Sequence, residues 1–152
     1  MEPDAATEFE LGRDGPHTVV VGVDGSVTSE RAASYAAGVA RREQSRLVVV
    51  FARYLGANTS AVAPGMGAAA VESLDAVEQH IRDRIAARPW SVRVELVIRA
   101  GTPLKVLTDV ADEVRAGLLV VGSSRPHAYY RPGGPLPVQL MRLRRWPVTV
   151  VP

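Results

Sequence analysis

Two short segments of this sequence carry residues whose types and positions suit contact with a ligand. The residues Asp-Gly-Ser at 24–26 follow one β-branched run, and Gly-Ser-Ser at 122–124 follow a second apolar run. The Asp24 carboxylate can accept hydrogen bonds from a ligand at the end of its strand. Because ligands of open parallel sheets bind at the carboxyl ends of strands, we predict a small-molecule crevice there. Asp24 is equally suited to capping the helix that follows it.

The residue types exclude several kinds of chemistry. The chain has no cysteine, which removes thiolate nucleophiles and disulfides. Its three histidines, His17, His80 and His127, lie too far apart for metal-ligand spacing. The motifs of α/β-hydrolases, P-loop proteins and zinc proteases are absent, and the serines of the two segments have only His127 nearby as a base. We therefore expect no catalytic residues, no metal and no enzymatic activity.

Charge is distributed unevenly along the chain. Residues 1–14 hold five acids and one base, whereas the segment from Val114 to the end holds six arginines and no acid. Arginine suits phosphate and carboxylate groups, so this third would suit a nucleotide, a nucleic acid or an acidic partner. The simpler interpretation is that these arginines form an ordinary solvated surface. Nucleic acid is not favoured as a partner, because the few aromatic residues are not part of an RNA-binding motif.

No segment has the features of a membrane span or a secretory leader. The apolar runs stay well below the ~20 residues that a span needs. The first residues are acidic and lack the basic and apolar regions of a signal peptide. We expect a cytoplasmic protein without a membrane partner.

Strand and helix patterns alternate along residues 17–152, which we interpret as one domain after a disordered acidic tail at 1–16. Apolar runs predict strands at 18–24, 46–54, 92–98, 118–122 and 147–151. Helical spacing and capping residues predict helices from Ser26 or Thr28 to about Glu43, from about 71 to Pro89, from Thr102 to Gly117 and at 138–145. The sequence GMGAAA at 65–70 resembles a phosphate turn, but it follows a long loop and is interpreted as part of a mobile connection.

This order predicts the fold class, an α/β three-layer sandwich of the flavodoxin-like or Rossmann-like kind. Right-handed crossovers favour a five-stranded parallel sheet in the order 3-2-1-4-5, with the switch point between the strands at 18–24 and 118–122. The last strand is apolar on both faces and lies at a sheet edge. Such an edge pairs readily with another strand. We therefore expect a homodimer whose interface contains the residues of that strand, Val148, Thr149, Val150 and Val151.

Three segments of the chain resemble the universal stress protein family. They are VVVGVDGSVTSERAASYAAGVA, GTPLKVLTDVADEVRAGLLVVGS and WPVTVVP, and the resemblance extends over about residues 18–152. It implies a flavodoxin-like sandwich, dimerisation through the last strand, and membership of either a nucleotide-binding or a non-binding group. For a binding member it implies that Asp24 contacts the adenine or ribose and that Ala52 lines the base pocket, with Val23 and Val121 beside them.

The resemblance also implies a phosphate loop that reads Gly, two residues, Gly, nine residues, Gly, then Ser or Thr. Gly122 matches the first glycine, and Gly134 matches the third after a one-residue deletion. Arg125 replaces the second glycine, and Pro135 stands at the hydroxyl position. Because Arg125 is bulky and Pro135 lacks both an N–H and a hydroxyl, we expect that this ATP-type loop is lost and that no cofactor is held.

The sequence thus favours a non-catalytic, homodimeric module of stress response or regulation that acts with an unidentified protein partner. Two alternatives stay open. One is a sensor of ATP, AMP or cyclic AMP that uses Asp24 and the loop from Gly122 to Gly134. The other is a binder of nucleic acid or another anion through the arginine-rich C-terminal third.

Overall fold

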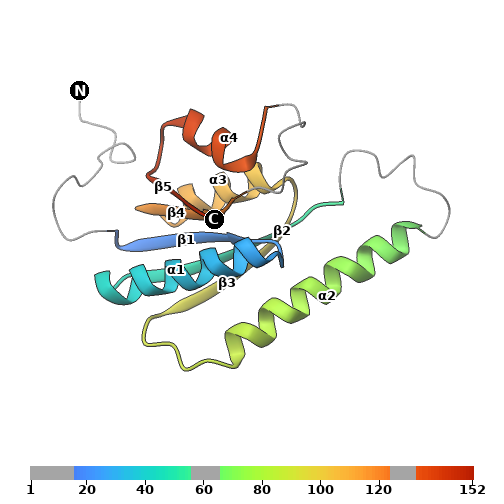
Figure 1. The fold of residues 1–152 in the computed structure, drawn as a ribbon, viewed down its shortest axis with the longest axis horizontal. Coiled ribbons are helices and arrows are strands. Elements are labelled where there is room, and N and C mark those ends of the chain that lie inside the picture. Colours follow the sequence, from blue (N-terminus) through green and yellow to red (C-terminus); the bar gives the residue numbers. More distant parts are fainter. Residues whose placement is uncertain (1–15, 56–65, 124–132) are drawn as a thin grey trace.

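The computed structural model describes residues 16–55, 66–123 and 133–152. Within these ranges strands and helices alternate along the chain (Figure 1). In order they are β1 (Thr18–Val23), α1 (Val27–Glu43), β2 (Arg46–Arg53), α2 (Met66–Ala86), β3 (Val94–Ala100), α3 (Pro103–Glu113), β4 (Leu118–Gly122), α4 (Leu136–Leu143) and β5 (Val148–Val151). The predicted sequence of elements is therefore confirmed.

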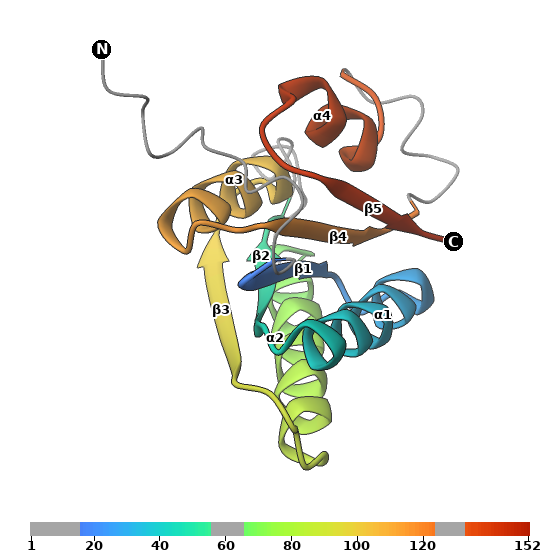
Figure 2. The same ribbon diagram turned by 90° about the vertical axis from the view of Figure 1, so that its left-hand side faces the viewer.

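The strands form one parallel sheet in the order β3-β2-β1-β4-β5. Helices α1 and α2 lie on one side of this sheet, and α3 and α4 lie on the other (Figures 1 and 2). This is the predicted three-layer sandwich with the predicted strand order. The winding direction reverses between β1 and β4, which places the switch point where the sequence analysis expected it.

The core explains why the sheet is covered on both sides. Val19, Val20 and Val21 of β1 are all completely buried. Val19 and Val21 belong to the cluster under α1 and α2, whereas Val20 belongs to the cluster under α3 and α4. Each such valine contributes roughly 1.5–3 kcal/mol by leaving water. If one face of the sheet had no helix, the valines on that face would stay in contact with water and would not contribute this free energy.

Local residue choices set the starts of the helices. Ser26 caps α1 by accepting a hydrogen bond from the backbone N–H of Ser29 at 3.2 Å. Thr102 caps α3 in the same way, with Pro103 at the first helical position. The inner face of α1 consists of Ala32, Ala36 and Ala40, all fully buried. Alanines allow this helix to approach the sheet closely.

Several predicted boundaries were wrong by a few residues. α2 begins at Met66, so the part of GMGAAA from there on is helical and not a mobile connection, in keeping with the strong helix propensity of Met and Ala. β3 lies two residues later than predicted because Arg99 and Ala100 still pair with the end of β2. α4 begins two residues earlier, since proline is tolerated in the first helical turn. α3 ends at Glu113, before Arg115 adopts a left-handed φ of 52°.

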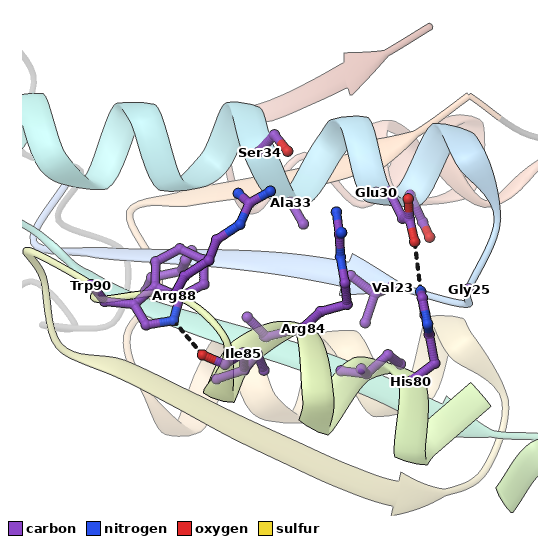
Figure 3. A pocket seen from close by; sticks show the side chains of 14 residues that line it. Val23, Gly25, Glu30, Ala33, Ser34, His80, Arg84, Ile85, Arg88 and Trp90 are labelled. Carbon is purple, nitrogen blue, oxygen red and sulfur yellow. Dashed lines mark hydrogen bonds and ion pairs between the residues drawn. The ribbon is translucent and has the colours of Figure 1, made fainter. Parts of the chain in front are cut away.

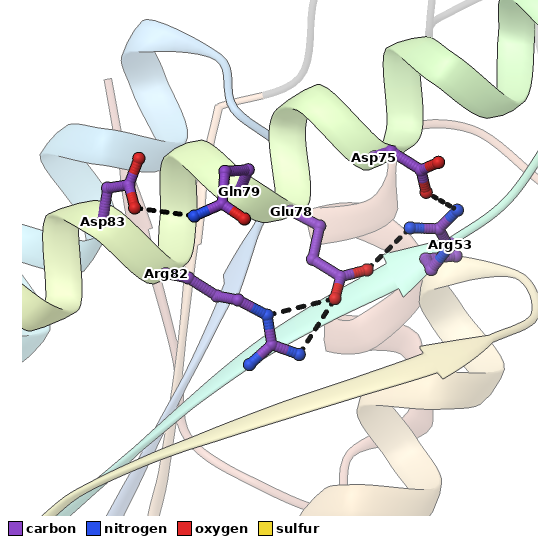
Figure 4. Close-up of polar contacts among 6 residues, drawn as sticks. All are labelled: Arg53, Asp75, Glu78, Gln79, Arg82 and Asp83. Carbon is purple, nitrogen blue, oxygen red and sulfur yellow. Dashed lines mark hydrogen bonds and ion pairs between the residues drawn. The ribbon is translucent and has the colours of Figure 1, made fainter.

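Helix α2 is held to the sheet mainly at two places. Among its described side chains only Ile81 is buried, with 7% of its surface exposed. Nearer its start, Arg53 of β2 donates hydrogen bonds to Asp75 and Glu78, each at 2.6 Å (Figure 4). Glu78 also accepts from Arg82 at 2.9 Å. An ion-pair network therefore supplements the modest apolar contact of this helix.

Replacing Glu78 with Gln should loosen the first half of α2. The pKa of Glu78 lies below its ordinary value because of hydrogen bonds first from Arg82 and then from Arg53. A lowered folded-state pKa stabilises the docked helix above the ordinary carboxyl range, and the contribution is lost as pH falls through the folded value. We expect amide hydrogen exchange in α2 to be about threefold faster in Glu78→Gln at neutral pH, and the difference to vanish in acid.

Asp83→Asn is the matched control for this experiment. Asp83 lies on the same helix but accepts a hydrogen bond only from Gln79, at 2.7 Å, among the contacts of the described chain. Equal acceleration in both variants would contradict a specific role for the Arg53 network.

Candidate functional site

The ends of three strands bring the predicted site residues to one edge of the sheet. The register pairs Val23, the last residue of β1, with Phe51 of β2. Asp24, which follows β1, is therefore next to Ala52 near the end of β2. Gly122 ends β4, on the other side of β1. The carboxyl-end edge predicted from sequence therefore exists, with residues of all three strands along it.

Asp24 forms a hydrogen-bonded turn at the start of α1. Its Oδ1 accepts from the backbone N–H of Ser26 at 2.8 Å, and its own N–H donates to Ser29 Oγ at 3.2 Å. The side chain is exposed at the edge of the sheet. Asp24 thus stabilises the turn before the helix, whereas Ser26 is the residue that caps α1. A ligand contact of Asp24 stays a prediction.

Gly122 is needed for packing, whatever else it does. A Cβ atom at this position would lie 2.7 Å from the carbonyl carbon of Thr28 and 2.8 Å from its oxygen. The Thr28 hydroxyl also donates to the backbone carbonyl of Ser123 at 3.1 Å. The first turn of α1 therefore rests directly on the end of β4. Sequence reasoning considered Thr28 only as a cap and missed this contact between segments 95 residues apart.

The apolar residues proposed beside the nucleotide do not share one face. Val121 is 2% exposed and lies in the core under α3 and α4, where Ala52 also packs. Val23 packs on the opposite side of the sheet, in the core under α1 and α2. The three side chains therefore do not line one common pocket for a base.

The start of α4 offers few donors for an anion. Pro135 is its N-cap and makes no side-chain capping bond, and Pro137 is in its first turn. Neither proline has an N–H, although the N-terminus of a helix normally binds anions through these groups. Gln139 donates to the carbonyl of Gly134 at 2.7 Å. Arg125 and His127 lie outside the described residues, so the loss of an ATP-type phosphate loop stays a prediction.

Gly134 has a conformational role in this turn. Its φ is +82°, in the left-handed region that favours glycine. A Cβ there would meet nothing closer than Val138 at 3.9 Å, so space alone does not demand a glycine. Its carbonyl oxygen already accepts a hydrogen bond from the Gln139 side chain. The third glycine thus shapes the entry to α4.

The other sequence predictions concern metals, catalysis and membranes. No group of three or more potential ligands could hold a metal in residues 16–55, 66–123 and 133–152. His80 Nε2 lies 2.7 Å from Glu30 Oε1 on the surface, and this hydrogen bond is the main cause of the lowered pKa of Glu30. None of the helices in that same part of the chain is long and apolar enough to cross a membrane.

The residues predicted for a dimer interface form the edge strand β5. Val148, Thr149 and Val151 are partly buried, whereas Val150 is 39% exposed. The strand pairs on one side with β4. Its position at the edge is as predicted, and pairing with a second copy stays a prediction.

Comparisons with known proteins place this fold in a defined group. The model of the universal stress protein family matches residues 16–152. A solved universal stress protein in complex with cAMP is 27% identical, with a TM-score of 0.66 over 91% of this chain and 98% of that one. One from Lactobacillus plantarum is 21% identical, with a TM-score of 0.64 over 89% and 97%. One from Arabidopsis thaliana with AMP bound is 18% identical, with a TM-score of 0.59 over 90% and 91%. No curated protein sequence matches.

Replacing Gly122 with Ala should destabilise the protein even without any ligand. Because the new methyl group would overlap the backbone of Thr28, the free energy of unfolding should fall by about 1–3 kcal/mol in urea denaturation. Gly38→Ala is the control, since the only contact there is the flexible end of Arg42 at 3.3 Å. This mid-helix change should stabilise the protein by about 0.5–1 kcal/mol. Unchanged stability in Gly122→Ala would contradict the packing role.

Proposed function

The chain belongs to the universal stress protein family, and from this premise we propose that it is a non-catalytic, homodimeric module of cytoplasmic stress response or regulation. It acts by engaging a protein partner and does not hold ATP in the manner of the family's phosphate loop. The observation that carries this proposal is the start of α4, where Pro135 and Pro137 remove backbone donors that an anion would meet.

The edge near Asp24 supports the same view of the phosphate loop. Gly122 lies beneath the first turn of α1, with the Thr28 hydroxyl bonded to the Ser123 carbonyl. The Thr28 hydroxyl, which lies beside the start of the loop after β4, is therefore already bonded within the protein. A triphosphate would have to be held by few backbone groups and by arginine side chains, which makes strong binding of ATP unfavourable.

A second candidate function is binding of a nucleotide with a single phosphate. It is favoured by the cAMP complex of a universal stress protein that is 27% identical to this chain. Asp24 and Ala52, side by side at the ends of β1 and β2, would contact the ribose and base. A single phosphate needs fewer hydrogen-bond donors than a triphosphate. The prolines at the start of α4 therefore reduce the binding of such a nucleotide less than that of ATP.

The exposed edge of the sheet supports the proposed dimer. β5 is a strand of Val, Thr, Val and Val whose outer edge presents backbone N–H and C=O groups. Pairing with the same strand of a second copy would satisfy these groups and cover Val150. A two-fold axis at this edge would continue the sheet through both copies.

Isothermal titration of the full chain with ATP, AMP and cyclic AMP tests the two candidates. With or without Mg²⁺, we expect no ATP binding up to ~1 mM. If cyclic AMP binds in the micromolar range, Asp24→Asn should weaken it by about tenfold while Asp83→Asn leaves it unchanged. Micromolar binding of ATP would contradict the loss of the phosphate loop.

Substitution of Val150 by Lys tests the dimer. A lysine on an edge strand opposes strand pairing by its charge and length. Sedimentation equilibrium should give a dimer for the unmodified chain and a monomer for Val150→Lys. Val71→Lys places the same charge on α2, at a residue that is 41% exposed, and should remain dimeric. A dimeric Val150→Lys would exclude pairing through β5.

A further inference from the structure

A cleft lies between α1 and α2 on the face of the sheet opposite α3 and α4. β1 and β2 form its floor, and the two helices form its walls (Figure 3). It is open on one side and has a volume of about 70 Å³. This is about half the volume of an apolar cavity that holds benzene, so a short hydrocarbon group can occupy it in part. Of the residues at the end of β1 and the start of α1 described above, Val23, Gly25 and Ser29 also line it.

The interior of the cleft is apolar. Its floor and walls include Leu47, Val49, Ile81, Ile85 and Trp90. The indole N–H of Trp90 donates to the carbonyl of Ile85 at 2.8 Å, so its polar atom is satisfied within the protein. The ring therefore offers apolar surface. A ligand inside would gain from burying hydrocarbon and would find few hydrogen-bond partners.

The mouth of the cleft is cationic. Arg84 lies in the last turn of α2 and Arg88 lies just after the helix ends, and Figure 3 shows both side chains extending toward α1. Neither guanidinium has an ion pair or hydrogen bond to the part of the chain that the structure describes. The nearby Glu30 is hydrogen-bonded to His80 at 2.7 Å. The mouth therefore presents two guanidinium groups against the one carboxylate of Glu30.

We propose that this cleft is a binding site for a small amphipathic monocarboxylate. A short hydrocarbon body packs in this space against Trp90 and Ile85. The carboxylate lies at the mouth, where guanidinium groups recognise it through charge-assisted hydrogen bonds. A nucleotide is too large and too polar for this cleft, and an amine would meet Arg84 and Arg88. The proposal is independent of the nucleotide and dimer proposals.

Nuclear magnetic resonance of the ¹⁵N-labelled full chain, with hexanoate as the probe, tests the site. The indole resonance of Trp90 should shift on titration, whereas that of Trp146, on the other face of the sheet, should not. Trp146→Phe assigns the two signals. Hexylamine has the same hydrocarbon body with the opposite charge and should bind at least about fivefold more weakly.

Two kinds of variant separate the charge from the cavity. Arg84→Gln with Arg88→Gln should weaken hexanoate at least about fivefold and leave 1-hexanol unaffected. Arg42→Gln changes an exposed arginine of α1 that does not line the cleft and should have no effect. Ala33→Leu should fill the cleft and abolish binding of both compounds while the cations remain in place.

Two outcomes would overturn the proposal. Hexylamine binding as tightly as hexanoate would remove the role of the arginines. No shift of Trp90 at ~10 mM hexanoate would mean that no monocarboxylate site exists here.

Discussion

The central strands are apolar on both faces, and the rest of the architecture depends on this property. Val19, Val20 and Val21 are wholly buried although neighbouring side chains point to opposite sides of the sheet. Two helical layers are needed to cover them, and parallel strands need crossover connections that supply those layers. The chain first passes from β1 to β2 and β3 on one side of the sheet, and then adds β4 and β5 on the other side of β1. The carboxyl ends of β1 and β4 therefore lie next to each other where the direction of winding reverses. The candidate site is a consequence of how this core is covered.

Features set by neighbouring residues were predictable from the sequence. The caps at Ser26 and Thr102 and the buried strands follow from local residue types, and the handedness of crossovers restricts the strand order. Features that depend on distances between remote segments were not. The contact of Thr28 with Gly122 joins two segments that only the folded sheet brings together. In the sequence, Arg84 and Arg88 look like solvated surface arginines, and only the folded chain places α1 opposite them. The start of α2 was missed because a glycine-containing stretch hid residues with strong helix propensity.

The two helices of one layer are held to the sheet in different ways. α1 uses a row of buried alanines that allows contact close to the backbone. α2 uses Ile81 and a few half-buried side chains, together with the ion pairs of Arg53 at the surface. Surface ion pairs contribute little to stability, so α2 is the less firmly attached of the two. The cleft exists because α2 meets the sheet through few large side chains and leaves space beside α1.

The close approach at Gly122 has a consequence for how sequences of this kind evolve. A side chain there would collide with the backbone of Thr28, so purifying selection on folding alone would preserve the glycine in lineages that have never bound a nucleotide. Its retention among descendants would therefore record helix packing and carry no information about ligands. Pro135 and Pro137, at the start of α4, are buried as well. Divergence there would therefore reflect the packing of α4 in addition to any change of ligand in a lineage.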